Sequence, residues 1–328
     1  MKRGHFIMKT RLCHLLGIEY PIIQGGMSLL ANAELAAAVS NAGGLGIISP
    51  NAGMLPEADI VENLYRQIKK ARRLTVKPFG VNLPLTQLMI NELIETVIKE
   101  RISVVVTGRG NPAIYTTYLK EAGAKVMHVA ASVKHARKAE ESGVDAVIAE
   151  GFESGGHGGF DEVASFVLVP QVVDAVNIPV VAAGGIADAR GFIAALALGA
   201  EGVQMGTRFF ASTECIAHQK AKEAIVRAID TDTVMTCRRF TPGRVLKNEV
   251  AARLVEMENN GASADEIEAF LGLNRARKAE IEGDLVNGEV FCGAIAGMIG
   301  EIVSAGEIVK SIIDNSAGVI NRLNRIRS

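Results

Sequence analysis

One histidine stands where a side chain could carry a proton to or from a substrate. His157 lies in the run Gly155-Gly156-His157-Gly158-Gly159, beyond a short apolar segment, where no hydrophobic core needs an imidazole. With an ordinary pKa of about 6.5, an imidazole can give or accept a proton at neutral pH. We therefore predict that His157 is the catalytic acid or base.

The other titratable groups have more ordinary interpretations. His128 falls inside an apolar run, where a hydrogen-bonded core histidine is the expected role. Glu153 and Ser154 precede the glycine run, but the chain has no GxSxG elbow and no evident acidic residue to orient a histidine. Hydrolysis by a nucleophilic serine is therefore not predicted.

Glycines gather directly after the short apolar runs. The groups are Gly25-Gly26-Met27, Gly108-Arg109-Gly110-Asn111, Gly151, Gly184-Gly185 and Gly206-Thr207. A missing side chain lets backbone N–H groups approach a ligand, and the last two strands of a parallel barrel often carry a phosphate site of this kind. Each glycine alone fits a tight turn, but the joint pattern predicts a phosphorylated ligand. The sequence has neither a GxGxxG fingerprint in the right context nor a GxxxxGK[ST] loop, so a Rossmann or P-loop site is not supported.

The elements that must position these residues follow from the hydrophobic pattern. Short runs rich in Val and Ile alternate with segments of helical period, such as 32–43, 57–71, 87–100 and 132–143, which indicates βα units around a parallel sheet. The eight expected strands are 20–24, 45–49, 79–83, 103–107, 125–129, 146–150, 179–183 and 202–206. Their number and nearly continuous apolar character favour an α/β fold, a (β/α)8 TIM barrel. An open doubly wound sheet is the alternative.

A single domain is expected over residues 9–328. Its barrel would span about 18–228 and a C-terminal helical appendage about 229–328, because the βα rhythm changes beyond Arg208 without a flexible linker. Met8 is a second possible start, so residues 1–8 are expected to be a dispensable N-terminal extension.

Composition narrows the partners and the compartment. The formal net charge of -1 gives no basic field for a nucleic acid backbone. The 4 cysteines are widely spaced, which predicts neither a disulfide framework nor a metal site. With no signal peptide and no apolar run near the ~20 residues of a membrane span, a cytoplasmic protein is expected.

Several longer segments resemble one family of flavoenzymes. They include IIQGGMSLLANAELAAAVSNAGGLGII, TGRGNP, AEGFESGGHGG, VPQVVDAVNIPVVAAGGIADARG and GAEGVQMGTRF. The chain resembles the superfamily of nitronate monooxygenases and type II (FabK-like) enoyl-acyl-carrier-protein reductases. The stretch AIDTDTVMTCRRFTPGRVLKNEVAARLVEMENNGAS and the segment GDLVNGEVFCGAIAG are closer to the reductase branch.

The resemblance implies a noncovalent FMN and a set of residues around it. Its ring would be lined by Gly25, Gly26, Met27, Asn82, Glu150 and Gly156, and its phosphate held by Gly184, Gly185, Gly206 and Thr207. NADH or NADPH would be the electron donor, and an acyl thioester, on acyl carrier protein or free, the substrate. A homodimer is compatible with the sequence.

The sequence does not determine which substrate accepts electrons from the flavin. Arg109 stands where the reductase branch commonly has a small residue, and Ala294 where it has Gln. A guanidinium at the barrel mouth could bind an anionic substrate group or extend into solvent. Nitronate oxidation with oxygen and quinone reduction are the enzymatic alternatives, and a flavin-binding sensor is the non-enzymatic one.

A basic cluster of Arg238, Arg239, Arg244 and Lys247 also has two interpretations. Such a cluster is usually a solvated face, but it could contact nicotinamide phosphates or an acidic carrier protein.

Overall fold

The computed structural model of the chain describes residues 9–55, 57–272 and 274–326. The N-terminal extension expected over 1–8 lies outside these residues.

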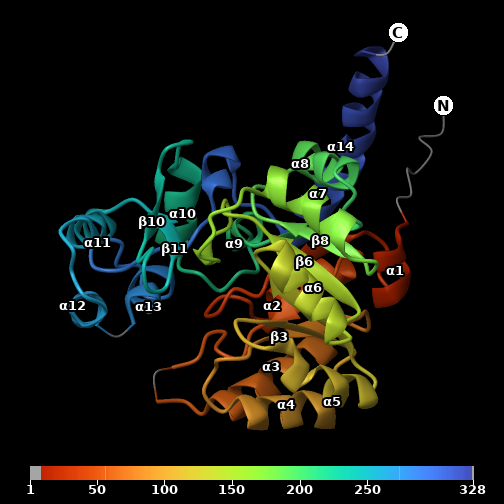
Figure 1. The fold of residues 1–328 in the computed structure, drawn as a ribbon, viewed down its shortest axis with the longest axis horizontal. Coiled ribbons are helices and arrows are strands. Elements are labelled where there is room, and N and C mark those ends of the chain that lie inside the picture. The colour runs from red at the N-terminus through yellow and green to blue at the C-terminus, as the bar shows by residue number, and fades with distance from the viewer. Residues whose placement is uncertain (1–8, 56, 273, 327–328) are drawn as a thin grey trace.

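Eight parallel strands form the centre of the molecule (Figure 1). They are β1 (Ile22–Gln24), β2 (Gly46–Ile48), β3 (Phe79–Pro84), β4 (Val104–Gly108), β5 (Lys125–Ala130), β6 (Ala146–Glu150), β8 (Val180–Ala183) and β9 (Gly202–Met205). The order is β1-β9-β8-β6-β5-β4-β3-β2, and a parallel bridge from Ile23 to Leu45 joins the two ends of that order. The predicted barrel is confirmed, with every strand in the run that the hydrophobic pattern marked.

Helices surround the strands on the outside. They are α2 (Ala33–Asn41), α3 (Ile60–Leu74), α4 (Ile90–Lys99), α5 (Thr116–Glu121), preceded by the short η1 (Pro112–Ile114), α6 (Val133–Glu141), α7 (Ser165–Ala175) and α8 (Ala189–Ala197). Several begin at a side-chain cap: Asp59, Ser132 and Asp188 each accept a hydrogen bond from a backbone N–H of the first turn. Such caps satisfy donors that have no partner within the helix.

A short helix covers the amino-terminal end of the barrel. Leu12 and Leu16 of α1 (Arg11–Leu16) pack in one buried cluster with inward-facing strand residues such as Ile23 and Val104. A side chain at Gly202 would collide with Leu12, so this end is filled to close packing. The opposite, carboxyl end is left for a ligand.

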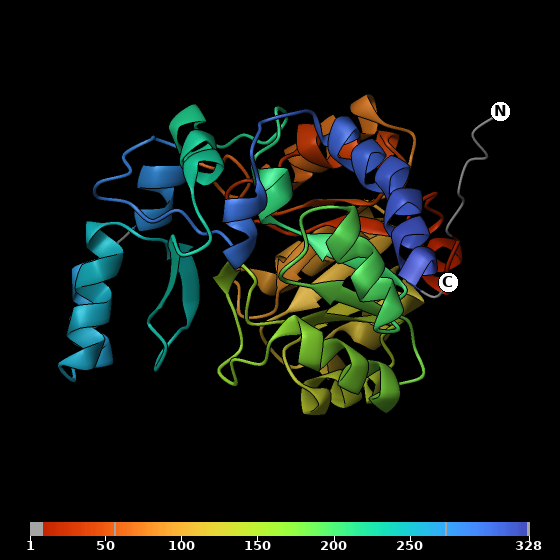
Figure 2. The same cartoon turned by 90° about the horizontal axis from the view of Figure 1, so that it is seen from above.

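The last helix lies against the barrel. α14 (Ala305–Ile326) contacts α8 and α2 and so takes the place of an eighth barrel helix (Figure 2). We expected residues 229–328 to form the appendage, but Ile308, Val309 and Ile312 give α14 a buried apolar face that fits between those two helices. The appendage is therefore an insertion between the last strand and the last helix.

We call residues 229–304 the roof. Two helices, α9 (Thr207–Phe210) and α10 (Gln219–Arg227), precede the roof. The roof itself contains β10 (Thr233–Thr236), β11 (Gly243–Leu246), α11 (Glu249–Asn259), α12 (Ala264–Leu271), α13 (Arg275–Glu280) and the 3₁₀ turn η2 (Ala294–Met298). It is not purely helical as expected, because β10 and β11 form an antiparallel sheet with β7 (Gly156–His157). The roof thus pairs directly with the predicted histidine loop.

Three further features concern membranes, cysteines and metals. No helix among the described residues is both long and apolar enough to cross a membrane. All four cysteines are buried, and Cys215, Cys237 and Cys292 are free thiols. No group of His, Cys, Asp and Glu within this part of the chain could hold a metal ion.

Candidate functional site

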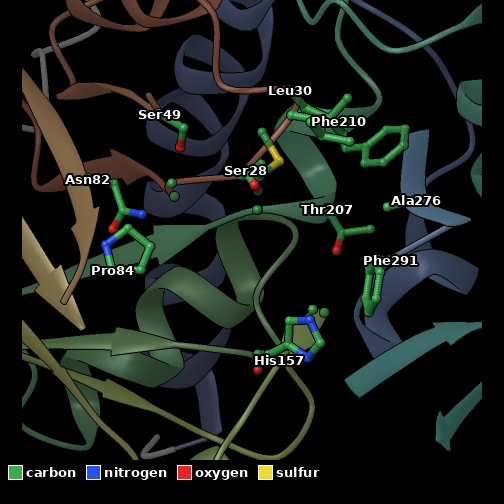
Figure 3. Close-up of a pocket in the computed structure, with 18 of the residues that line it drawn as sticks. Ser28, Leu30, Ser49, Asn82, Pro84, His157, Thr207, Phe210, Ala276 and Phe291 are labelled. Carbon is green, nitrogen blue, oxygen red and sulfur yellow. The ribbon is translucent and has the colours of Figure 1, made fainter. Parts of the chain in front are cut away.

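A cavity of about 770 Å³ lies between the carboxyl ends of the strands and the roof. All of the site residues predicted from the sequence line it: Gly25, Gly26, Met27, Asn82, Arg109, Glu150, Gly156, His157, Gly184, Gly185, Gly206 and Thr207. Figure 3 shows Asn82 on one side of this space and Phe291 of the roof on the other, with His157 between barrel and roof. Residues from across the chain are thus brought to one site, although their individual roles stay predictions.

His157 is held by the roof. It pairs with Gly243 in the β7–β11 ladder, and the N–H of Gly158 donates to the carbonyl of Pro242 at 3.0 Å. The imidazole lies 3.4 Å (Nδ1) from the hydroxyl of Thr241, and its ring centroid is 5.1 Å from that of Phe291. The glycine run around His157 is therefore fixed in position, as an acid or base requires.

The surroundings of His157 favour its neutral form. Its side chain is open to the cavity, yet enough protein surrounds the ring that burial lowers the pKa of His157 below its ordinary value, and the nearby charge of Arg109 lowers it further. Hydrogen bonds with the Thr241 and Pro242 backbone act in the opposite direction. At pH 7 the imidazole is mostly neutral, and its protonated form is a stronger acid than free imidazolium.

Glu150 is a second titratable group in the wall. Burial raises the pKa of this carboxyl to about 7, and a hydrogen bond with the Ser154 side chain opposes the rise. Near neutral pH the group can therefore either donate or accept a hydrogen bond. The Ser154 side chain is thus hydrogen-bonded to Glu150. It has a structural partner, and a nucleophilic role was not predicted for it.

We call the carboxyl ends of the eight strands the rim of the barrel. Its glycines leave space for different reasons. A Cβ at Gly26 would overlap the side chain of Asn82, so this glycine lets β1 and β3 come together. Gly184 has a φ of +89°, and a Cβ there would lie 2.9 Å from the carbonyl oxygen of Gly151. Gly206 has an ordinary φ of -98°, and its Cβ would meet only Met27, at 3.8 Å. Of these, Gly206 leaves open space towards the cavity.

Hydrogen-bond donors border that open space. The hydroxyl oxygen of Thr207 accepts the N–H of Gly293 at 2.8 Å, which leaves its own proton free to donate. Among the described residues, no acceptor pairs with the backbone N–H groups of Gly185 and Thr207. Thr207 begins α9, so its N–H has no acceptor within the helix, and both N–H groups are available to a ligand.

Two cavity residues were missed by the sequence analysis. The hydroxyl of Ser49 and the side-chain carbonyl of Gln204 are buried, and neither has a hydrogen-bond partner within the described part of the chain. Ser49 closes a predicted strand, and Gln204 is a polar residue inside an apolar one. That polarity was the available signal, because a buried unpaired polar atom costs free energy unless a ligand or water satisfies it.

Three other residues considered in the sequence analysis, His128, Glu153 and Ala294, make structural contacts. His128 is a core histidine as expected: it is buried, and its Nδ1 lies 2.7 Å from the hydroxyl of Thr107. The carboxylate of Glu153 accepts the N–H and hydroxyl of Ser165 at the start of α7. Ala294 donates its N–H to the carbonyl of Glu153 at 2.9 Å and so ties the roof to the barrel.

The basic cluster does not line the cavity. Arg238 pairs with Glu162, and Arg239 lies over the ring of Phe240. Arg244 stacks on the ring of Phe152 and donates to the carbonyl of that residue. A role for the cluster in binding a carrier protein or a nucleotide stays a prediction.

Known proteins resemble the chain along almost its whole length. A model of the nitronate monooxygenase family matches residues 9–93 and 85–315. A probable nitronate monooxygenase from Staphylococcus saprophyticus is 35% identical, with 96% of this chain and 99% of that protein covered. The structure of FabK from Thermotoga maritima is 45% identical, with a TM-score of 0.90 and 97% and 99% of the two chains covered. A nitroalkane oxidase from Streptomyces ansochromogenes is 28% identical, with a TM-score of 0.83 and coverage of 96% and 100%.

The influence of Arg109 on the histidine can be measured directly. We expect Arg109→Gln to raise the pKa of His157, because the substitution removes a positive charge that disfavours the imidazolium. Titration of the histidine ring protons by NMR, assigned with a His157→Ala sample, measures the change.

Arg101→Gln is the matched control, because Arg101 is also exposed and also has a positive φ, at the other end of β4. Equal His157 pKa values in the two variants would show that Arg109 does not act on the imidazole.

Proposed function

We propose that the chain, which belongs to the nitronate monooxygenase family of flavin-dependent oxidoreductases, is an enoyl reductase. It would use FMN and NADH or NADPH to reduce 2-enoyl thioesters, including those on acyl carrier protein. The observation that carries this choice is the likeness to FabK, which extends over barrel and roof alike. The free, buried thiols of Cys215, Cys237 and Cys292 fit the cytoplasm as its compartment.

The residues present fit FMN. The unpaired Ser49 hydroxyl and Gln204 carbonyl offer hydrogen bonds to a polar ring edge, and the N–H groups of Gly185 and Thr207 and the Thr207 hydroxyl offer donors to a phosphate. The Asn82 and Glu150 side chains would add further polar contacts to the ring. When bound, the flavin supplies the hydride chemistry.

The chain's own contribution is proton transfer and positioning. The imidazole of His157 would give a proton to the α carbon of the substrate, and its lowered pKa makes that proton easier to release. Since the ring is open to the cavity, it can take up a new proton from water after each turnover. Phe291 would restrict the ring's movement through their contact.

Nitronate oxidation is the second candidate, favoured by the family model and the staphylococcal relative. There the neutral imidazole would accept a proton from the substrate, a role that its lowered pKa also suits. The two candidate functions differ in the substrate that reoxidises the reduced flavin, so a comparison of such substrates distinguishes them.

An acceptor panel tests the proposal. Protein reduced anaerobically by NADH or NADPH should be reoxidised faster by crotonyl thioesters than by quinones, and alkyl nitronates should not turn over with oxygen. Flavin absorbance in a stopped-flow instrument follows each reaction. Turnover of nitronates together with no reaction of enoyl thioesters would establish the second candidate instead, and a flavin that no nicotinamide cofactor reduces would favour the sensor.

Gly206→Leu tests where the phosphate lies. The side chain would fill the open space at Gly206 without backbone strain, so the protein should fold and purify without its yellow colour. Gly318→Leu is the control, because Gly318 is an exposed helical glycine with open space around it. Absorbance at the flavin band and circular dichroism give the two readouts. Full flavin content in folded Gly206→Leu protein would place the phosphate elsewhere.

His157→Ala should separate cofactor binding from proton transfer. Flavin content should be kept, and the reaction with the enoyl thioester should fall by about 10²–10⁴-fold, the usual contribution of a positioned acid. In the wild type this reaction should slow as the pH rises through the pKa of His157, because an acid must be protonated; a base in nitronate oxidation would give the opposite slope. His135→Ala, on the exposed face of α6, is the control. Equal losses in reduction by the nicotinamide cofactor and in reaction with the thioester would instead show that His157 only shapes the pocket.

A further inference from the structure

The roof side of the cavity contains a buried charge that the flavin site does not use. Arg277, in α13, lines the cavity and is 7% exposed. No hydrogen bond or ion pair to its guanidinium is formed by any described residue. Its nitrogen atoms are not among the buried side-chain atoms that lack a partner, so the guanidinium of this largely buried residue opens into the cavity, where its donors are available to a ligand.

A neighbouring arginine on the same helix shows what a structural role looks like. The guanidinium of Arg275 donates to the carbonyls of Leu271, Asn287 and Phe270 at 2.8, 2.7 and 2.7 Å. It thereby joins α12, α13 and the following turn. Arg277, two residues further on, makes none of these contacts and has its donors available.

Two carboxyl groups of the same wall, Glu280 and Glu289, form no ion pair with Arg277 within the described residues. Glu280 lines the cavity, and its carboxylate accepts the N–H of Phe291 at 3.0 Å. Burial raises the pKa of Glu280 to about 8, so the group is mostly protonated at pH 7 and can donate a hydrogen bond. Burial also raises the pKa of Glu289, to about 6, against the charge of Arg275, so this carboxyl is still mostly ionised at pH 7. We call the part of the cavity lined by Arg277, Glu280 and Glu289 the roof lobe. Its guanidinium fork and the protonated carboxyl of Glu280 can both donate hydrogen bonds to an oxyanion.

The position of the lobe indicates which ligand it serves. Glu280 is bonded to Phe291, and the Phe291 ring contacts His157, so the lobe continues the wall that holds the proton-transfer residue. The phosphate proposed for the flavin lies instead at Gly206 and Thr207 on the barrel rim. A molecule in the roof lobe would therefore be one that reaches His157 from the roof, as an exchanging substrate does.

We propose that Arg277 binds a phosphate group of the exchanging substrate, either of the nicotinamide donor or of the acyl thioester's coenzyme. The proposal rests on the proposed reductase function, since both of its substrates carry phosphates. Arg277 would then contribute to substrate binding and would not transfer a proton in the reaction.

Fragment binding to the oxidised, flavin-loaded protein tests this without turnover. The probes are 5′-ADP and 2′,5′-ADP for the two nicotinamide donors and 3′,5′-ADP for coenzyme A, with titration calorimetry as the measurement. Arg277→Gln should weaken one of them by about 10- to 100-fold, since a charge-assisted hydrogen bond contributes that much affinity. Arg277→Lys should restore part of the loss. Arg253→Gln, an exposed roof arginine paired with Glu256, is the control.

The pattern of losses identifies the source of the phosphate. A loss confined to 5′-ADP or 2′,5′-ADP assigns it to the donor, and a loss confined to 3′,5′-ADP assigns it to the thioester. The melting temperature of Arg277→Gln should equal or exceed that of the wild type, because no structural contact is lost.

Three results would overturn the proposal. They are unchanged binding of all fragments by Arg277→Gln, no fragment binding by the wild type, and loss of flavin from Arg277→Gln, which would place Arg277 at the flavin instead. None of them depends on which acceptor the enzyme reduces, so the proposed function can fail separately.

Discussion

Closure of the barrel determines where every functional residue lies. The backbone of Leu45, just before β2, exchanges hydrogen bonds with Gln24 and Ile22 of β1, each at 2.9 Å, and these bonds close the strand order. In a closed parallel barrel all carboxyl ends share one rim. Residues after the first strand, such as Gly26, therefore meet residues of the third, such as Asn82, and face those after the last two. In an open sheet of the same order, β1 would still pair with β9 but would lie at the opposite edge from β2 and β3, so Gly26 would not meet Asn82.

The second half of the site comes from an insertion. Because α14 returns to the barrel, the roof is fastened at both ends and lies over the rim. Three hydrogen bonds hold it there: the N–H of Gly293 donates to the Thr207 hydroxyl, that of Ala294 to the Glu153 carbonyl, and that of Gly158 to the Pro242 carbonyl. This close approach explains part of the glycine run. A Cβ at Gly155 would collide with the backbone of Cys292 and Gly293, whereas Gly156 and Gly158 have open space. Some of these glycines thus serve contact between roof and barrel, and others leave room beside the histidine.

The sequence predicted what is encoded locally. Strands buried on both faces are continuous apolar runs, so all eight could be located, and glycines at their ends marked the rim and the residues in its wall. Contacts between distant segments were not encoded in this way. Three features depend on which distant segments pack together: the pairing of His157 with β11, the packing of α14 against the barrel, and the lack of a partner for Arg277 among the described residues. Ser49 and Gln204 were marked in the sequence only by their polarity within apolar runs, and their lack of hydrogen-bond partners in the described part of the chain became evident only in the folded structure.

Binding of an anion by this chain would depend on local groups rather than on its overall field. With a formal net charge of -1, it generates little long-range attraction for a phosphorylated substrate. A charge at the exposed mouth, such as Arg109, is screened by water and salt, so its main effect falls on the nearby imidazole. A guanidinium shielded from water interacts far more strongly with a bound anion, because the local dielectric is lower and the fork is already oriented. Two arginines on the same cavity can therefore divide the work, one adjusting proton transfer at His157 and the other supplying affinity.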